Sequence, residues 1–364
     1  MSPTFGLSKA QRDLRRTGIG SSEIGVLAGL SPYGSPMEVW AAKVHGLEKD
    51  ETLAMTLGTL TEEPIARLYA KRTGLYLGRV GTIQCAAKPF IIATPDRSAH
   101  GLKPRRARAG LEEVDHFLEV KHTTMQLRQR WGPEGTDQVP AEHLAQVTWQ
   151  MRATGPTAES PQVRRTDVAA LFDKKEFAVF TVTYSVELAL GLEEVGERFM
   201  VDHVLAKVPP PPDASAQYKE TLTRIFPAET GGLKPAPMEL EEAALVLREL
   251  KHHHKALGER VELIENALRL CIGDGKGVQG RFGSVTWTKN RDGSATDWRA
   301  VAEAMRELWR GSIGDAAAKE FLRLVAEKTA PTPGARVLRK NWNKELPPPA
   351  GSPPASCALE LELS

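Results

Sequence analysis

The stretch that decides the fold is F-L-E-V-K-H at residues 117–122, which has the composition of a short buried strand. Side chains alternate between the two faces of a strand, so Glu119 and Lys121 share one face while Leu118 and Val120 share the other. A carboxylate beside an ammonium group, on an otherwise apolar strand, suits a metal ligand next to a charge stabiliser. Taken alone, a surface strand with one acid–base pair is the simpler explanation. The site hypothesis therefore depends on whether other segments bring further acids to this strand.

One further acid lies on an expected helix over residues 54–73, which Gly74 ends. Glu62 falls near the edge of the helix's apolar stripe, so it is either a solvated helix acid or a glutamate aimed into a cleft. Pro64 predicts a break, or a new first turn, close to Glu62. The stripe itself is formed by Leu57, Leu60, Ile65, Leu68 and Tyr69.

Another acid, Asp96, follows an apolar strand expected over residues 90–94. Pro95 cannot donate to a strand ladder, so Asp96 lies where this strand ends. An acid at the end of a buried strand is a frequent ligand and an equally frequent turn residue. The strand pattern alone does not separate these two interpretations.

Two basic clusters are candidate phosphate contacts. A loop bounded by Gly101 and Gly110 either contacts DNA phosphates or forms a solvated tip. Arginines and serine hydroxyls also surround the start of a short helix that follows Gly20, which makes either an anion site or ordinary helix capping. The loop cations are Lys103, Arg105, Arg106 and Arg108, and the helix-start candidates are Arg15, Arg16, Ser21 and Ser22.

After the basic loop, a helix over 141–154 carries Gln146 beside its apolar face, and a β-rich segment and a long helix follow it.

The whole chain is expected to divide into three regions. The prolines at 209–212 form a stiff linker, which predicts a first domain over 1–212. Residues 213–342 are expected to be a helical extension with a β-hairpin and heptad-like leucines over 238–270. Residues 343–364 have the composition of a disordered tail.

Composition limits the possible functions. The 364 residues carry a formal net charge of only +2, so any nucleic-acid surface must come from local clustering. The three cysteines form no C-x-x-C pair, which argues against a zinc finger or a four-cysteine cluster and suits a reducing cytoplasm. We expect no signal peptide and no membrane span, because no apolar run is long enough.

Together these segments form an ordered set that resembles the PD-(D/E)xK nuclease superfamily. More closely, the chain resembles the YqaJ-type viral recombinase family, to which phage lambda exonuclease belongs, over roughly residues 10–213. The resemblance implies an α/β, restriction-endonuclease-like core, with a mixed central sheet flanked by helices; a mainly helical extension would follow. The matching stretches are G-I-G-S-S-E-I-G-V-L-A-G-L-S-P-Y-G-S-P at 18–36, G-T-L-T-E-E-P-I-A-R-L-Y-A-K-R-T-G at 58–74, A-T-P-D at 93–96, L-E-V-K at 118–121 and V-P-A-E-H-L-A-Q-V-T-W-Q-M at 139–151.

The resemblance also implies roles for the site residues. Carboxylates suit hard cations, so Mg²⁺, with Mn²⁺ as a substitute, would bind Glu62, Asp96 and Glu119, and by resemblance the Val120 carbonyl. Glu63 is the alternative to Glu62. The implied catalytic residues are Glu62, Asp96, Glu119, Lys121 and Gln146, and the implied 5′-phosphate contacts are Arg15 or Arg16, Ser22 and Thr94.

The family further implies 5′-to-3′ digestion of linear double-stranded DNA in the cytoplasm of a bacterium or phage-infected host. A ring-shaped homo-oligomer, trimer or tetramer, and a single-strand annealing protein as partner belong to the same expectation. Two other functions remain open at this point: a restriction-type or structure-specific endonuclease on the same core, and a non-catalytic DNA-binding scaffold.

Overall fold

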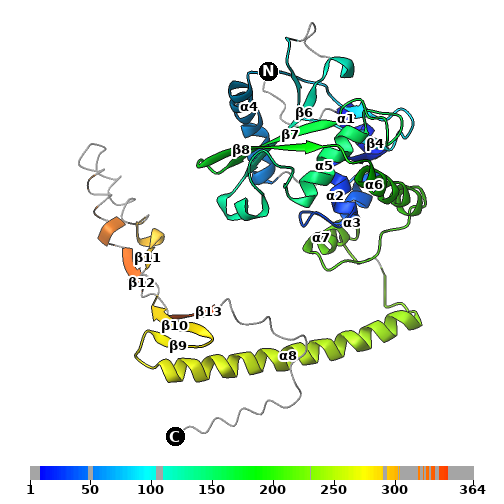
Figure 1. Ribbon diagram of the computed structural model, residues 1–364. Helices are drawn as coiled ribbons and strands as arrows, with labels where there is room; N and C mark the ends of the chain where they lie inside the picture. Colours follow the sequence, from blue (N-terminus) through cyan, green and yellow to red (C-terminus); the bar gives the residue numbers. More distant parts are fainter. Residues whose placement is uncertain are drawn as a thin grey trace. The chain divides into compact units, whose positions relative to one another are not determined.

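The computed structural model describes residues 9–47, 52–103, 110–229, 231–289 and 293–301, and only parts of 303–342 beyond these. The chain divides into two compact units, Met1–Gly231 and Gly232–Ser364, which we describe separately. Figure 1 shows the first unit as helices around a central sheet. Three of the predicted loop cations, Arg105, Arg106 and Arg108, lie outside the described residues, as does the predicted tail over 343–364.

A mixed five-stranded sheet forms the centre of the first unit, in the order β2-β5-β6-β7-β8. Strands β6 and β7 are parallel, and the other neighbours are antiparallel. Parallel neighbours need a crossover connection, and helix α5 (Ala141–Arg152) lies within the one that joins β6 to β7. The strands are β2 (Tyr76–Gly78), β5 (Arg97–His100), β6 (His116–Thr123), β7 (Arg165–Phe172) and β8 (Glu176–Thr183).

The alternation of β6 places a different helix on each face of this sheet. Phe117 packs with Val147 and Met151 of α5. On the opposite face, Leu118 packs with Ile65 and other residues of helix α4 (Leu53–Thr73). The expected α/β fold, a mixed central sheet flanked by helices, is confirmed.

Helix α4 differs from its sequence-based description in two ways. It continues through Pro64 without a break. The half before Pro64 is exposed, so water can satisfy the carbonyl that loses its donor. Exposure also changes the apolar stripe: Leu57, Leu60 and Leu68 are exposed, and the helix is anchored on the sheet by Ile65, Ala66 and Tyr69.

A second layer of the first unit contains a small sheet in the order β1-β4-β3 and a large apolar core. Trp149 of α5 joins the two layers, because its indole N–H donates to the Ile19 carbonyl at 3.0 Å. The elements of this layer are α1 (Lys9–Arg16), β1 (Ile19–Gly20), α2 (Ser21–Leu27), α3 (Pro36–Val44), β3 (Ile83–Gln84), β4 (Ile91–Ala93) and α6 (Val186–Phe199). Two 3₁₀ segments, η1 (Leu111–Glu113) and η2 (Met125–Arg130), flank β6 in the chain.

The first unit continues beyond the proline-rich segment at 209–212, where the sequence suggested a boundary. Helix α6 passes into a π-helical segment, η3 (Met200–Leu205), and then α7 (Ala216–Ile225) follows the prolines. Tyr218 of α7 is buried, and its hydroxyl donates to the Pro210 carbonyl. Asp213 accepts a hydrogen bond from the Ser35 hydroxyl at 2.6 Å. These contacts hold the segment to the core, and the unit runs to Gly231.

The described residues of the second unit form a long helix and two small sheets. Helix α8 (Met238–Ile272) leads into the expected hairpin of β9 (Gly277–Gly280) and β10 (Gly283–Lys289). A third strand, β13 (Arg336–Trp342), pairs with β10, and β11 (Gly293–Thr296) pairs with β12 (Thr329–Thr332). Across the described parts of both units, no helix combines the length and apolar composition needed to cross a membrane.

Candidate active site

Glu119 of β6 is at the centre of a polar cluster between the sheet and α5. Its side chain is 3% exposed, and both of its oxygens accept hydrogen bonds. Oε1 accepts from Lys121 Nζ at 2.7 Å and from Gln146 Nε2 at 2.6 Å, while Oε2 accepts from Gln150 Nε2 at 2.7 Å. Gln146 and Gln150 are four residues apart on α5 and so share one face of that helix.

Lys121 completes a triangle with Glu119 and Gln146, because its ammonium group also donates to Gln146 Oε1 at 2.9 Å. Burial lowers the pKa of Lys121, but the negative charges of Glu119 and Asp96 outweigh it, and the net pKa is raised. The side chain therefore carries its positive charge at neutral pH, held in place by an acid and an amide. The expectation that Glu119 and Lys121 share a face is met by this direct contact.

Asp96 lies between β4 and β5, and its side chain contacts the backbone of β6. Its Oδ2 accepts a hydrogen bond from the Val120 N–H at 2.8 Å. The β5–β6 ladder ends at the Arg97–Leu118 pair, which leaves Val120 beyond the ladder and open to a side-chain acceptor. Burial, then the charges of Glu119 and Glu62, raise the pKa of Asp96 well above its ordinary value. Three carboxylates therefore influence one another here.

Glu62 is held by a residue that the sequence did not single out. Arg97, the first residue of β5, donates one guanidinium nitrogen to Glu62 and the other to Glu63 at 2.9 Å. The Arg97 side chain is 7% exposed, so this cation is nearly buried between α4 and the sheet. Glu63 also pairs with Arg67, and these two arginines lower its pKa. The only signal in the sequence was a basic residue directly after Asp96.

The donor set suits a hard divalent cation. Carboxylate and carbonyl oxygens are the ligands that Mg²⁺ and Mn²⁺ prefer. Burial first, and the charges of Glu119 and Glu62 second, raise the pKa of Asp96, and a bound cation would offset both effects. Among the residues that the structure describes, however, no three Asp, Glu, His or Cys side chains converge closely enough to hold a metal. Glu62 in particular is engaged by Arg97, so its use as a ligand requires release from that arginine.

The start of α2 lies at the same sheet edge as Asp96. Strands β1 and β4 are parallel neighbours, so the segments that follow them, Ser22 after β1 and Thr94 after β4, leave the sheet on one side. The Thr94 hydroxyl contacts the Thr82 hydroxyl at 3.1 Å, and Ser22 is exposed. The helix start is capped by Glu23, whose carboxylate accepts from the Gly20 N–H at 2.7 Å. Ordinary helix capping is therefore observed at the start of α2, and the capping side chain is Glu23 rather than a serine.

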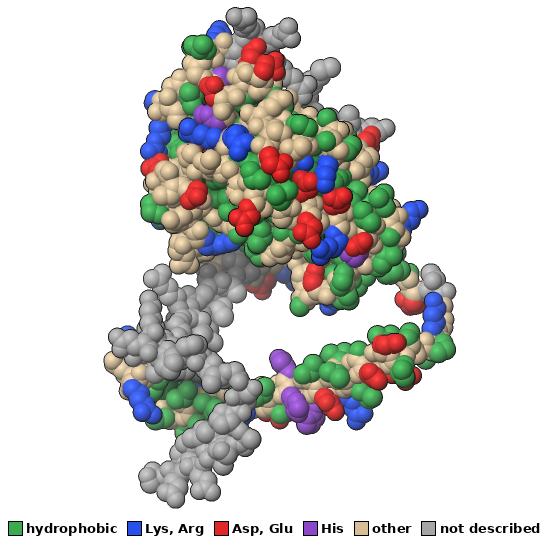
Figure 2. Space-filling model, turned by 45° about the vertical axis from the view of Figure 1, so that its right-hand side comes forward, with side chains coloured by type: hydrophobic (Ala, Val, Ile, Leu, Met, Phe, Trp, Pro, Cys, Tyr) green, Lys and Arg blue, Asp and Glu red, His purple; other side chains and the backbone are tan. Residues whose placement is uncertain are grey.

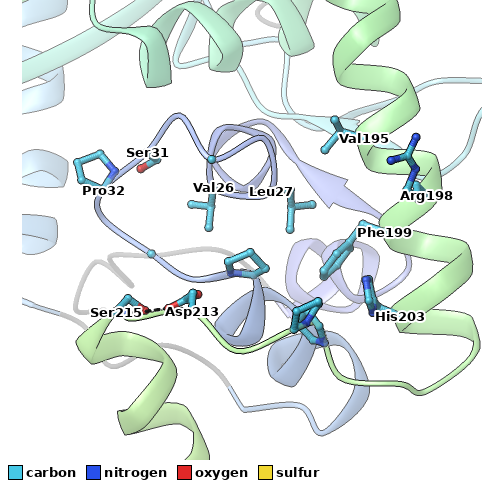
Figure 3. A pocket seen from close by; sticks show the side chains of 15 residues that line it. Val26, Leu27, Ser31, Pro32, Val195, Arg198, Phe199, His203, Asp213 and Ser215 are labelled. Carbon is cyan, nitrogen blue, oxygen red and sulfur yellow. Dashed lines mark hydrogen bonds between the residues drawn. The ribbon is translucent and has the colours of Figure 1, made fainter. Parts of the chain in front are cut away.

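The other predicted phosphate contacts differ in exposure. Arg15 is half-buried, and burial lowers its pKa although Glu23 opposes that effect. Arg16 and Lys103 are exposed. A separate pocket of about 650 Å³ lies between α2, α6 and the proline-rich segment, with Phe199, His203 and Asp213 in its wall (Figure 3). None of the acidic site residues lines this pocket.

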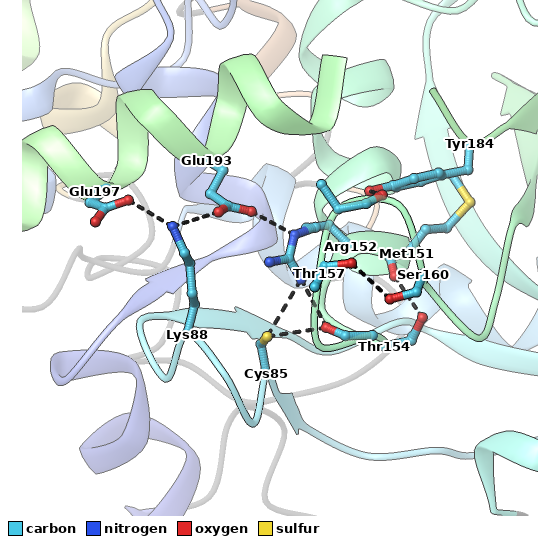
Figure 4. A network of polar contacts seen from close by, with 12 residues as sticks. Cys85, Lys88, Met151, Arg152, Thr154, Thr157, Ser160, Tyr184, Glu193 and Glu197 are labelled. Atoms are coloured by element: carbon cyan, nitrogen blue, oxygen red, sulfur yellow. Dashed lines mark hydrogen bonds and ion pairs between the residues drawn. The ribbon is translucent and has the colours of Figure 1, made fainter. Parts of the chain in front are cut away.

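A buried ion-pair network fixes α5, and with it Gln146 and Gln150. Arg152, the last residue of α5, donates its Nε to Glu193 of α6 at 2.7 Å. Figure 4 shows Lys88 on the other side of Glu193 and Cys85 beneath the guanidinium group. The end of α5 is thus tied to α6 and to the β3–β4 connection.

The fold and the site define an α/β protein with an acid–lysine–glutamine cluster on its central sheet. A sequence model of the family described as "YqaJ-like viral recombinase domain" matches residues 12–157. The matched part includes every residue of the cluster.

The chain is similar to the uncharacterized protein YqaJ of Bacillus subtilis (strain 168), with 26% identity over 219 residues. The match covers 59% of this chain and 62% of YqaJ. Two crystal structures of LHK-Exo, an alkaline exonuclease from Laribacter hongkongensis, one of them with dAMP, are 15% identical. Their TM-scores are 0.41 and 0.42, and they cover 60% of this chain and 97% and 100% of their own.

Proposed function

We propose that the first unit is a metal-dependent deoxyribonuclease of the exonuclease type, acting in recombination by converting DNA ends into single strands. The observation that carries the proposal is the triangle of Glu119, Lys121 and Gln146, with Asp96 bonded to the Val120 N–H beside it. The match of residues 12–157 to the model of a viral recombinase family supports the recombination role.

The residues divide the work of phosphodiester hydrolysis. Asp96 and Glu119, with the Val120 carbonyl and a released Glu62, would hold Mg²⁺ or Mn²⁺. When bound, such a cation lowers the pKa of water and offsets charge on the phosphate. Lys121 orients the attacking water or stabilises the charged phosphate, and Gln146 fixes the lysine. Gln150 holds the second oxygen of Glu119, and so restrains its rotation.

The proposed substrate is a linear double-stranded DNA end, digested from 5′ to 3′. The 5′ phosphate would be received by Arg15 or Arg16 together with Ser22 and Thr94. The two arginines precede β1 in the chain, Ser22 follows β1, and Thr94 follows the neighbouring strand β4. The basic loop with Lys103, Arg105, Arg106 and Arg108 would add phosphate contacts. A ring-shaped homo-oligomer and a single-strand annealing partner complete the proposal.

Digestion of two forms of one plasmid tests the proposal. With Mg²⁺, the linear 5′-phosphorylated duplex should be degraded, the covalently closed circle should persist, and a chelator should stop degradation. Cleavage of the circle would favour the endonuclease alternative. If neither form is cut while DNA still binds, the scaffold alternative is favoured.

Arg97 should oppose metal binding, because its guanidinium group donates a hydrogen bond to the Glu62 carboxylate. The variant Arg97→Gln is expected to bind Mn²⁺ about tenfold more tightly, since a charge-assisted hydrogen bond of roughly 1.5–3 kcal/mol no longer has to be broken. Calorimetric titration without DNA measures this directly. Arg67→Gln is the matched control, because Arg67 is 79% exposed and pairs with Glu63 alone. Equal or weaker Mn²⁺ binding by Arg97→Gln would show that Arg97 supports the site instead.

A further inference from the structure

Helix α8 carries a continuous heptad pattern along its whole length. Ten positions spaced alternately three and four residues apart run from Leu240 to Cys271, and all but one are apolar or cysteine. This is the a/d spacing of a coiled-coil seam. The a positions are Leu240, Leu247, His254, Val261 and Leu268, and the d positions are Ala243, Leu250, Leu257, Ile264 and Cys271.

The seam is largely exposed. Leu240, Leu250 and Leu257 are 59%, 60% and 51% exposed, whereas Ile272, at the end of the helix, is buried where α8 meets the β9–β10 hairpin. Figure 2 shows hydrophobic side chains along this helix, with the histidines near its middle. A helix of 35 residues is stabilised mainly by packing of its apolar face. The exposed seam is therefore a surface on which a second helix could pack.

We propose that this partner is α8 of a second copy of the chain, aligned in parallel and in register. The charged residues beside the seam are compatible with this parallel pair. In such a pair, each g position of one helix faces an e position of the other. These facing positions give one pair of opposite charge, Arg260 with Glu265 of the second copy, and no pair of like charge. Self-association of this helix is independent of the proposed nuclease activity, because no residue of the cluster around Glu119 lies in the second unit.

His254 decides the orientation. In a parallel, in-register pair, each residue meets its own counterpart, so the one polar a residue faces a second histidine. In the antiparallel pair that aligns the same ten layers, His254 would face Leu257, and an imidazole would be buried against an apolar side chain. A single polar layer of this kind fixes register in coiled coils.

Cys271 provides the test, because it occupies a d position and is exposed in the free chain. In a full-length Cys357→Ser variant, mild oxidation should link Cys271 to Cys271 of a second copy. Introducing Leu250→Asp together with Leu257→Asp should abolish the crosslink. The matched control is Leu245→Asp with Leu263→Asp, two exposed leucines of the same helix outside the seam, which should keep the crosslink.

Three results would overturn the proposal. The crosslink could be absent from the Cys357→Ser variant, or it could form equally in the seam and control variants. A seam that packs on another part of the same chain would give the first of these results. The third result is loss of the crosslink in the control variant alone, which would show that α8 associates through a different face.

Discussion

Replacing Lys121 by alanine is expected to lower the rate of DNA cleavage by at least about 100-fold, the usual loss when a positioned charge stabiliser is removed. The Lys121 ammonium group contacts both Glu119 and Gln146, so its removal takes away a positive charge beside the carboxylates. The measurement is a single-turnover cleavage assay with saturating Mg²⁺ on a linear 5′-phosphorylated duplex.

The same substitution should leave the fold and DNA binding largely intact. Glu119 keeps its hydrogen bonds from Gln146 and Gln150, so the carboxylate is not left without donors. Lys71→Ala, at an exposed lysine of α4, is the control for general loss of positive charge and should cleave at the normal rate. Normal cleavage by Lys121→Ala, in protein of unchanged melting temperature, would remove Lys121 from the mechanism.

The part of the site that follows from local geometry could be predicted from the sequence. Alternation along a strand places Glu119 and Lys121 together whatever surrounds them, and the contact between them is observed. Gln146 could be selected because it lies beside the apolar face of an expected helix, but only the family pattern connected it to Lys121. Pro95 predicted that Asp96 lies just after the end of a strand, and the structure places Asp96 between β4 and β5.

The parts that depend on packing between distant segments could not be predicted. Nothing in the sequence of β5 distinguishes Arg97 from other strand residues. Its contact with Glu62 exists because Arg97 pairs with Leu118, on whose face of the sheet α4 packs. Gln150 likewise lies on α5 at a distance of 31 residues from Glu119. The extent of the first unit depends on packing in the same way: the prolines at 209–212 indicate stiffness, whereas the contacts within the unit continue through α7 to Gly231.

Glu193→Ala is expected to have the largest effect on stability among the ion pairs described here. The Arg152 side chain is 1% exposed, and Glu193 is its partner in the core. Removing the carboxylate leaves a buried guanidinium group without its counter-charge, at a cost of about 3–5 kcal/mol in the free energy of unfolding. Glu194→Ala is the matched control, since Glu194 is the next residue and its pair with Arg198 is exposed. That exposed pair should contribute no more than about 1 kcal/mol.

The pH dependence of this difference provides a second measurement. Burial raises the pKa of Glu193, but hydrogen bonds from Lys88 and Arg152 outweigh burial and lower it. A carboxyl group whose pKa is lower in the folded than in the unfolded state stabilises the fold above its unfolded pKa, about 4.3, and loses that contribution as the pH falls further. Urea unfolding at pH 7 should therefore separate Glu193→Ala widely from the parent chain, and the gap should narrow below about pH 4. Equal losses for the Glu193 and Glu194 variants at pH 7 would mean that Arg152 finds its stabilisation in the Gly155 carbonyl and Cys85 instead.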